Sequence, residues 1–419
     1  MVNDRLGHVV VLEEKVAVNR NRIVFWLGEP SPHQSSVLCG LADVACDRRI
    51  ITIFQRRLSN DRLAQGWHVP HPGRTRVVMA PDGPSIAQIA RQEPEASVHV
   101  FGGMRLPMIR RALRECSATN ALLGVASEGR PGDGVLGVLR RSSTFVLERP
   151  YRKRTDFVLA IGKHAAQWYE MCGYSQDRIF DWGYFVEAPP RRALAPIQRS
   201  WVAITFVGQL IRRKGLDTLI RALSRLNSRH WKLEIVGDGS ERRSLQKLAF
   251  EFGIGDRVCF IGPMSNSQVR EVLAHSDLLV LPSRFDGWGA VVNEALMEGI
   301  PAICSDMCGA AVLLRSRVLG AIYRAGSVDE LAAVLASTIE RGPLPLAQRR
   351  ENQTWSRCIS GGAAARYLLE IIEHVSGGAG ERPLAPWQCE HVLGRNMRSL
   401  RDTGARALQT IANSQRCVE

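Results

Sequence analysis

Short apolar runs alternate with amphipathic segments along the first half of the chain. Such runs predict buried strands, and the helical spacing of apolar residues between them predicts helices. The predicted strands span residues 22–28, 50–54, 75–79, 97–101, 121–126, 156–161 and 179–182. Regular strand–helix alternation is typical of doubly wound domains with a parallel sheet. We therefore predict such a domain over residues 22–187, after an extension of residues 1–21.

The same alternation resumes after a Pro-rich segment, which we interpret as an interdomain linker over residues 188–200. The second set of predicted strands spans residues 201–207, 232–236, 257–261, 278–281 and 302–304. These strands predict a second doubly wound domain over residues 201–355. A further helix is expected within residues 356–376, followed by a tail of residues 377–419. Residues 398–411 of this tail could form a basic amphipathic helix.

The most informative stretch covers residues 278–304, which predict a strand, a glycine loop, a helix and a strand. Pro282 ends the first strand, and Gly287-Trp288-Gly289 leads into the helix. This layout directs backbone N–H groups and a helix N-terminus toward a ligand above the sheet, and it favours a phosphate. Asp286 precedes the loop and Glu294 lies inside the helix. The alternative is that Asp286 only caps the loop and Glu294 is only an exposed helix residue.

The two carboxylates and their spacing resemble the Glu-x7-Glu signature of retaining glycosyltransferases with the GT-B architecture, in particular glycosyltransferase family 4. The resemblance implies two Rossmann-like domains facing a cleft and a last helix that crosses back to the N-terminal domain. It implies that Glu294 binds the ribose of a sugar nucleotide and that Asp286 lies beside the donor sugar. This chain departs from the signature because Asp286 replaces the first Glu.

A basic loop after the strand at 201–207 extends the resemblance. Members of the family have Gly-Arg-Leu and then Lys-Gly here, and the Arg and Lys bind the donor diphosphate. This chain has Gln209 at the Arg position and retains Lys214, so Arg212 or Arg213 could supply the missing charge. Fixed cations stabilise the charge that develops on a departing diphosphate.

The chain contains no Asp-x-Asp pair that would chelate Mg²⁺ or Mn²⁺. We therefore expect metal-independent catalysis by Asp286, Lys214 and Glu294, with no metal site and no cofactor besides the donor substrate. Gly287, Trp288, Gly289 and the arginines are expected to hold the diphosphate. By resemblance, the nucleobase is expected to rest against the backbone near Gly262.

In the N-terminal half the resemblance covers only the layout. There the loop after the first strand is expected to face the cleft, which makes Gly28, His33 and Gln34 candidates. A helix is expected to begin near Gln34. Glu128 follows a strand at the edge where α/β sheets bind ligands. A solvated loop histidine and a turn carboxylate without chemistry are the alternatives for His33 and Glu128. Residues 129–141, which contain four glycines, give no clear element.

Composition narrows the choice of partners. The net charge of +14 attracts anions such as nucleotide diphosphates, nucleic acid or an acidic membrane surface. No nucleic-acid-binding motif is present, so we expect no nucleic acid partner. Residues 141–154 are rich in arginine and could contact acidic lipid headgroups. No apolar run reaches membrane-spanning length, and the ten cysteines lack zinc spacing. We expect a cytoplasmic enzyme, with the inner face of the cell membrane as an alternative location.

Together these features predict a retaining glycosyltransferase that moves a sugar from a nucleotide-diphosphate donor to a glycan or lipid-linked acceptor. Cell-surface polysaccharide synthesis is the expected context. Two alternatives remain open: a sugar-nucleotide 2-epimerase of the same fold, and a non-catalytic sugar-nucleotide-binding protein. The substitutions at Asp286 and Gln209 are what keep the second alternative open.

Overall fold

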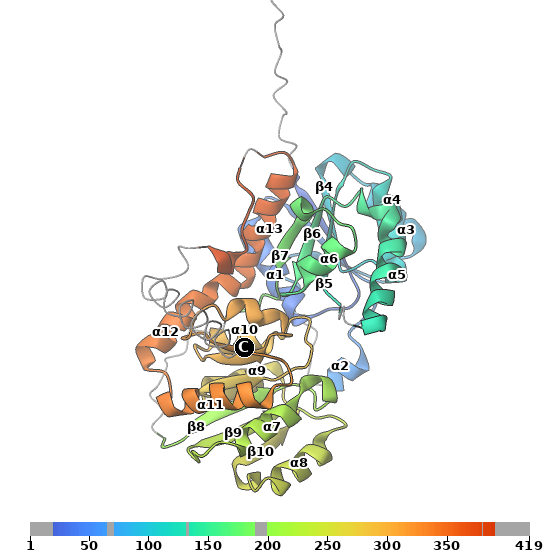
Figure 1. Ribbon diagram of the computed structural model, residues 1–419. Helices are drawn as coiled ribbons and strands as arrows, with labels where there is room; N and C mark the ends of the chain where they lie inside the picture. Colours follow the sequence, from blue (N-terminus) through green and yellow to red (C-terminus); the bar gives the residue numbers. More distant parts are fainter. Residues whose placement is uncertain (1–19, 65–70, 131–133, 189–198, 379, 390–419) are drawn as a thin grey trace, which may run out of the picture.

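The computed structural model describes residues 20–64, 71–130, 134–188, 199–378 and 380–389. They form two α/β halves stacked one above the other (Figure 1). The N-terminal sheet has the strand order β3-β2-β1-β4-β5-β6-β7, and the C-terminal sheet has the order β10-β9-β8-β11-β12-β13. All pairs within both sheets are parallel. Most of the predicted linker, at residues 189–198, and most of the predicted extension, at residues 1–19, lie outside the described residues.

The N-terminal half follows the predicted alternation. Its strands are β1 (Arg22–Leu27), β2 (Arg49–Phe54), β3 (Arg76–Met79), β4 (Ser97–Phe101), β5 (Leu122–Glu128), β6 (Phe157–Ile161) and β7 (Ile179–Trp182). Its helices are α1 (Pro32–Val44), α2 (Asn60–Ala64), α3 (Gly83–Arg91), α4 (Pro107–Ser117), α5 (Gly134–Arg152) and α6 (Ala165–Met171). The central strands β1, β4 and β6 are buried along their whole length, as continuous apolar runs predict for a sheet covered on both faces.

The C-terminal half repeats this plan. Its strands are β8 (Val202–Val207), β9 (Trp231–Val236), β10 (Val258–Gly262), β11 (Leu278–Leu281), β12 (Ala302–Ser305) and β13 (Gly320–Tyr323). Its helices are α7 (Leu216–Ser224), α8 (Arg242–Glu251), α9 (Asn266–Ala274), α10 (Val291–Met297) and α11 (Val328–Arg341). Helices α12 (Leu346–Trp355) and α13 (Gly361–Val375) complete the fold.

Several elements differ from the sequence prediction. Helix α1 begins at Pro32 rather than near Gln34, because a proline fits the first helical turn, where its missing N–H is not needed. Helix α5 begins at Gly134, within the stretch 129–141 to which no element was assigned. Strand β13 was not predicted, since it is short and only one of its four residues is buried. Helix α12 was also missed.

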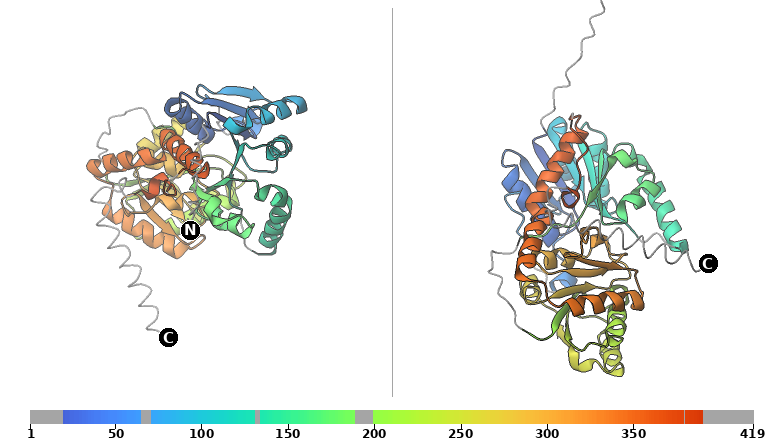
Figure 2. Two further views of the ribbon diagram at one scale, coloured as in Figure 1. Left: turned by 90° about the horizontal axis from the view of Figure 1, so that it is seen from above. Right: turned by 60° about the vertical axis from the view of Figure 1, so that its left-hand side comes forward.

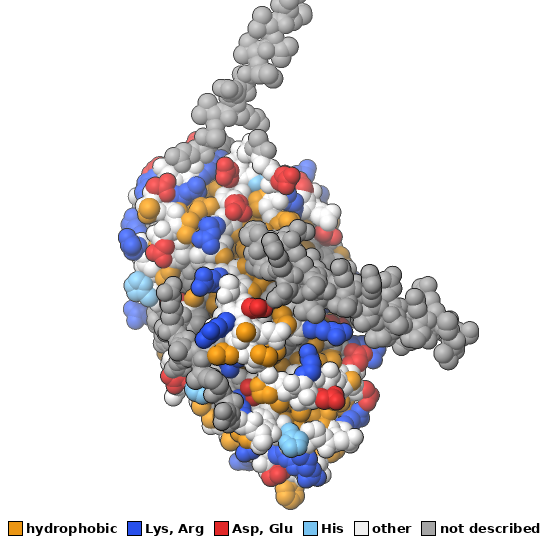
Figure 3. Space-filling view, turned by 90° about the vertical axis from the view of Figure 1, so that its left-hand side faces the viewer, with side chains coloured by type: hydrophobic (Ala, Val, Ile, Leu, Met, Phe, Trp, Pro, Cys, Tyr) orange, Lys and Arg blue, Asp and Glu red, His pale blue; other side chains and the backbone are white. Residues whose placement is uncertain are grey.

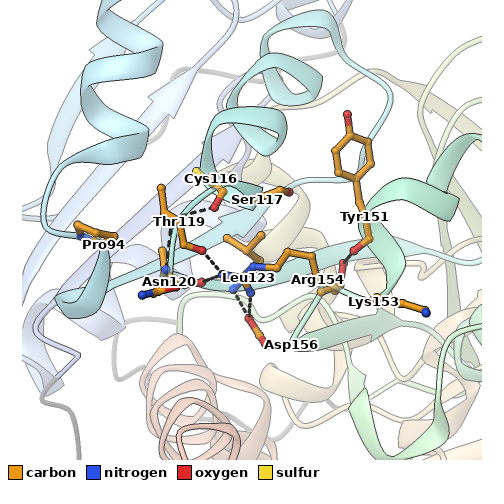
Figure 4. A network of polar contacts seen from close by, with 12 residues as sticks. Pro94, Cys116, Ser117, Thr119, Asn120, Leu123, Tyr151, Lys153, Arg154 and Asp156 are labelled. Atoms are coloured by element: carbon orange, nitrogen blue, oxygen red, sulfur yellow. Dashed lines mark hydrogen bonds and ion pairs between the residues drawn. The ribbon is translucent and has the colours of Figure 1, made fainter.

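A polar network fixes the ends of β5 and β6 that lie away from the cleft (Figure 4). Arg154 forms an ion pair with Asp156 at 3.1 Å and donates hydrogen bonds to the carbonyls of Thr119 and Ala121 at 2.7 and 2.5 Å. Asp156 in turn accepts a hydrogen bond from the N–H of Leu123 at 2.8 Å. Because this network sets the register of both strands, it also positions the residues at their opposite ends, including Glu128.

Helix α13 crosses from the C-terminal half to the N-terminal sheet and packs along α1 (Figures 1 and 2). The two helices approach closely at glycines. A Cβ on Gly40 would lie 2.3 Å from the carbonyl oxygen of Gly361, and one on Gly361 would lie 2.0 Å from that of Ser36. One apolar core continues through this crossing, because residues of both sheets pack together with α13.

Residues 380–389 return to the N-terminal half rather than forming a separate tail. The guanidinium of Arg382 lies 4.4 Å from the ring centroid of Phe180 and donates to the carbonyl of Asp177 at 2.7 Å. Trp387 is buried in the shared core, and Gln388 donates to Asp181 at 2.8 Å. No local pattern of residues predicted this packing. The candidate helix at residues 398–411 lies outside the described residues.

The positive charge is not gathered over the crossing helices. On the face that carries α12 and α13, basic and acidic side chains are interspersed (Figure 3). None of the helices in the described part of the chain is long and apolar enough to cross a bilayer.

Candidate active site

An ion pair at the carboxyl ends of β8 and β11 forms the centre of the candidate site. Lys214 closes the one-turn helix η3 (Arg212–Lys214) after β8, and Asp286 belongs to the loop after β11. Lys214 Nζ lies 2.6 Å from Asp286 Oδ2, and both side chains are largely buried. Ser283 also donates to Asp286 Oδ2, at 3.3 Å. Two residues selected from the sequence are therefore in direct contact.

The structure distinguishes the two candidate arginines. Arg213 points toward the same loop, because its Nη1 lies 3.9 Å from Asp286 Oδ1 and donates to the carbonyl of Phe285 at 2.9 Å. Arg212 is exposed, and among the described residues its side chain has no hydrogen-bond or ion-pair partner. Arg213, not Arg212, therefore joins Lys214 beside Asp286. Gln209 is half-buried in the loop that leads to η3.

The glycine loop offers unused backbone donors. Within the described residues, the N–H groups of Gly287, Trp288, Gly289 and Ala290 have no hydrogen-bond acceptor. Helix α10, which follows, has only seven residues. The loop donors, rather than a long helix dipole, are therefore what this site presents to an anion.

The side chain of Trp288 packs inside the protein core. It is fully buried, and its ring centroid is 5.9 Å from that of Trp387 and 6.4 Å from that of Tyr184. Its Nε1 donates to Asn293 Oδ1 at 2.7 Å, and Asn293 Nδ2 donates to the carbonyl of Tyr184 at 2.8 Å. Trp288 therefore joins the two halves, and only its backbone remains available for the diphosphate role expected from the sequence.

Among the described residues, Glu294 forms no hydrogen bond or ion pair with Lys214 or Asp286. It is half-buried in α10, and burial raises the pKa of its carboxyl to about 7, with repulsion from Glu298 adding to the effect. Arg270 opposes the rise in pKa. No hydrogen bond to the Glu294 carboxylate from another described residue is present, so this carboxyl group can accept one from a ligand.

Glu128 reaches across from the N-terminal half to the glycine loop. A Cβ on Gly287 would lie 2.0 Å from Glu128 Oε2, so only glycine admits the carboxylate there. Tyr184 donates its hydroxyl to Glu128 Oε1 at 2.6 Å. Burial raises the pKa of Glu128, and the charge of Asp286 raises it further. The N-terminal sheet thus places a carboxyl group directly against the loop that follows β11.

A cavity of about 330 Å³ adjoins Glu128 on the N-terminal side. His33 and Gln34 line it together with Tyr184, and the rings of His33 and Tyr184 stack with centroids 4.7 Å apart. Burial lowers the pKa of His33 to about 4, so this histidine is neutral at physiological pH. The alternative of a solvated loop histidine is therefore wrong.

Two predicted glycines lie apart from the Lys214–Asp286 pair. Gly28 follows β1 and packs against Leu106, since a Cβ there would lie 2.8 Å from the leucine side chain. Gly28 is not among the residues that line the cavity. Gly262 ends β10, where its carbonyl accepts a hydrogen bond from the N–H of Gly237 at 2.7 Å.

Comparison with known proteins identifies the fold of this chain. Residues 198–355 match the family model of Glycosyl transferases group 1. HepE of Anabaena, solved in complex with UDP, superposes with a TM-score of 0.65 at 16% identity, over 84% of this chain and 100% of that chain. The apo form of WaaB, a lipopolysaccharide outer core galactosyltransferase, gives a TM-score of 0.63 at 16% identity, over 84% and 99%. The chain has the GT-B fold.

The curated relatives match shorter parts of this GT-B chain. An uncharacterized glycosyltransferase of Methanocaldococcus jannaschii is 31% identical over 143 residues, or 34% of this chain and 36% of that protein. A GDP-mannose-dependent phosphatidylinositol monomannoside mannosyltransferase of Mycobacterium tuberculosis is 28% identical over 255 residues, or 58% of each protein. The chain thus spans between about a third and three fifths of the length of these relatives.

Sequence reasoning missed the residues that join the two halves. Tyr184 holds Glu128 and stacks on His33, and Gly183 makes room for Trp288, since a Cβ on Gly183 would lie 2.3 Å from its ring. A Gly-Tyr pair just after the last strand of the first sheet was the only signal available. This pair indicated the edge of the sheet, but it did not indicate which residues Gly183 and Tyr184 would contact.

Proposed function

We propose that this GT-B protein is a retaining glycosyltransferase that uses a nucleotide-diphosphate sugar and a glycan or lipid-linked acceptor. The observation that carries the proposal is the contact between Lys214 and Asp286, with Arg213 beside it, at the loop whose N–H groups lack acceptors. Cations and free N–H donors suit a diphosphate, and a carboxylate suits sugar hydroxyls. Glu128 faces this loop from the other half.

The geometry and the resemblance to the family signature support the following division of roles. Lys214 and Arg213 neutralise the charge that the diphosphate gains as the bond from its oxygen to the sugar C1 breaks. The backbone of Gly287, Trp288 and Gly289 holds the diphosphate. Asp286 orients the donor sugar. The cations therefore take the part that a divalent metal plays elsewhere, which supports a metal-independent reaction.

Glu294 is proposed to accept hydrogen bonds from the ribose. It lies one to two helical turns beyond the glycine loop, and a rise of 1.5 Å per residue places it about 7 Å past Gly289, roughly the length of a diphosphate. Its carboxylate has no hydrogen-bond donor among the described residues. Ribose hydroxyls would supply the missing donors.

In the proposed transfer, the acceptor oxygen forms a bond to C1 on the face from which the diphosphate leaves. The acceptor proton passes to the departing phosphate oxygen, so neither a covalent sugar–enzyme intermediate nor a protein base is required. This route retains the anomeric configuration. Cell-surface polysaccharide synthesis is the context we propose.

We further propose that α5 rests on an acidic membrane surface. Apolar side chains make up most of its outer face, and Val135, Leu136 and Val146 are 78%, 64% and 67% exposed. Arg149 and Lys153 are exposed near its end, without an ion-pair partner among the described residues. An apolar helix face with flanking cations is typical of helices that lie in the membrane interface.

A screen of nucleotide sugars tests the proposed activity. Released nucleoside diphosphate is measured with and without a panel of acceptors, and NMR of the product reports the anomeric configuration. Acceptor-dependent release with retention is expected, and Asp286→Asn serves as the impaired control. Conversion of the donor without any acceptor would favour an epimerase. Tight nucleotide binding with no turnover would favour a binding protein.

Vesicle sedimentation tests the membrane surface. The protein should bind vesicles of phosphatidylcholine with about a third phosphatidylglycerol, and a Val135→Ser/Val146→Ser variant should bind them much more weakly. Phe250→Ser is the matched control, because Phe250 is equally exposed but lies on α8 of the other half. Equal binding by both variants would show that α5 is not the docking surface.

A further inference from the structure

A second cavity, of about 180 Å³, shares Glu128 in its wall with the cavity that His33 lines. It opens at the carboxyl ends of β4 and β5, and α5 covers it with Thr144 and Glu148. Ser127 and Glu128 line both cavities. The second cavity therefore adjoins the candidate active site, shares these two residues with it and adds others, among them Arg105 and Arg130.

Two arginines from different loops face this second cavity. Arg105 follows β4 and donates to Thr144 Oγ1 at 2.8 Å, and Arg130 follows β5. Across the described residues, neither guanidinium forms an ion pair with a carboxylate. The two cations repel each other, and after burial this repulsion is the main reason that the pKa of Arg130 is lowered, while attraction to Glu148 opposes the effect.

Two carboxyl groups, those of Glu128 and Glu148, also line the cavity, but among the described residues neither forms an ion pair with Arg105 or Arg130. Glu148 is buried and accepts a hydrogen bond from the Tyr174 hydroxyl at 2.9 Å. Burial raises the pKa of Glu148, so its charged form is disfavoured. The two guanidiniums therefore have no ion-pair partner, at a site covered by a helix where burial disfavours the charged forms of both carboxyl groups. An anion bound there would relieve the repulsion between Arg105 and Arg130.

We propose that this cavity binds a phosphate group carried by the acceptor. A guanidinium presents paired N–H donors that match the oxygens of a phosphate, and two guanidiniums from separate loops can bind two of its edges. The hydroxyls of Ser127 and Tyr169, which also line the cavity, can serve a third oxygen. A phosphate carries close to two negative charges at neutral pH, which matches the charge of two arginines. A carboxylate ligand carries one negative charge and would need only one arginine.

On the basis of the proposed transferase function, a phosphate bound in this cavity would anchor the acceptor beside the donor site. Glu128 separates the cavity from the loop at Gly287, so an acceptor anchored by its phosphate would extend past Glu128 toward the donor sugar. The phosphate could belong to a free sugar phosphate or to a lipid headgroup beneath α5. Both share the chemistry that the arginines recognise.

The test compares ligands that differ in one group. Calorimetry measures the binding of glucose 6-phosphate, glucuronate and glucose, together with dihexanoyl phosphatidic acid below its micellar concentration. The wild-type protein should bind at least one phosphate-bearing probe and should bind glucose and glucuronate at least tenfold more weakly. Arg130→Gln and Arg105→Gln should each weaken binding of that probe about tenfold or more, as loss of a charged hydrogen bond predicts.

Two controls separate this proposal from the proposed function. Arg110→Gln removes an exposed arginine from α4 near the same loop and should bind the probe normally. Binding of a nucleoside diphosphate should be unchanged in all three variants, which also shows that they fold. The sugar phosphate and the short-chain lipid distinguish the two sources of the phosphate by which of them binds.

The outcomes that overturn the proposal are distinct from those that overturn transferase activity. If no phosphate-bearing probe binds, if glucuronate binds as well as glucose 6-phosphate, or if the arginine variants bind like wild type, the phosphate site is wrong even when transfer occurs. If the probe binds through Arg105 and Arg130 but no donor is ever consumed, the phosphate site stands and the transferase function fails. A tungstate peak between the two arginines in soaked crystals is expected as a readout independent of activity, and a peak only near Lys214 would count against the site.

Discussion

Replacing Gly287 by alanine tests whether the Glu128 carboxylate really occupies the space beside the glycine loop. The new Cβ would lie 2.0 Å from Glu128 Oε2 and 2.3 Å from its Cδ. At an ordinary contact distance of roughly 3.5 Å, the carboxylate must retreat by about 1.5 Å. The backbone at Gly287 does not have a positive φ, so alanine adds a collision without adding backbone strain.

The magnitude follows from what the retreat breaks. Tyr184 donates to Glu128 at 2.6 Å, and a displacement of this size removes that hydrogen bond. A hydrogen bond to a charged group contributes about 2 kcal/mol, so Gly287→Ala should lower the free energy of unfolding by about that amount. Because a misplacement of about 1 Å at a reacting centre costs about a hundredfold in rate, kcat/KM should fall on that order.

The assay is a double-mutant cycle in urea, followed by circular dichroism. Glu128→Ala removes the obstacle, so adding Gly287→Ala to that variant should change its stability little. Gly255→Ala is the control, because a Cβ there meets its nearest atom only at 3.7 Å. An equal loss of stability from Gly287→Ala with and without Glu128 would refute the reasoning, since some other neighbour would then be the obstacle.

Four further predictions address the donor site. Lys214→Ala should lower kcat/KM by about a hundredfold or more while the protein stays folded, because one fixed donor at a developing charge is lost; normal steady-state kinetics would remove Lys214 from the reaction. Arg213→Ala should be clearly slower than wild type and Arg212→Ala should not, while Gln209→Arg should add little; a large gain in the last variant would mean that Arg213 does not replace the usual arginine. Affinity for the nucleotide sugar should rise from pH 6 to pH 8, because the Glu294 carboxyl has a pKa of about 7 and ionises across this range. The ionised carboxylate is the better acceptor for ribose hydroxyls. Calorimetry should show an affinity that does not change with pH for Glu294→Gln. Transfer should continue after dialysis against EDTA, and a loss that Mg²⁺ or Mn²⁺ restores would contradict the proposed role of the cations.

Much of the fold was predictable because parallel strands that are buried on both faces appear in the sequence as continuous apolar runs. Lys214 and Asp286 were identified through the resemblance to a family signature, and both follow strands at the carboxyl edge where α/β sheets bind ligands. Their direct contact depends only on the order of strands β8 and β11 within one sheet. Contacts of this kind, between loops that follow neighbouring strands of one sheet, can be predicted once the strand order is known.

The contacts between the halves could not be predicted in this way. Whether Glu128 meets Gly287 depends on how the two sheets are oriented, and no local pattern records that. Helix α5 escaped prediction for another reason: its buried stripe consists of Gly137, Thr144 and Glu148, while its apolar residues face outward, so its pattern is inverted. The buried position of Trp387 was hidden because it follows a glycine-rich break.

The close packing of α1 against α13 determines where natural or engineered recombination can cut this chain. Because the contact at Gly40 and Gly361 leaves no room for a side chain on either glycine, α13 behaves as a discontinuous part of the N-terminal module, and residues 380–389 travel with it. A chimera that exchanges only residues 22–187 would pair α1 with a foreign helix. The exchangeable cassette for a new donor specificity is therefore an insert, bounded by residues 201 and 355, within an acceptor module that comes from both ends of the chain.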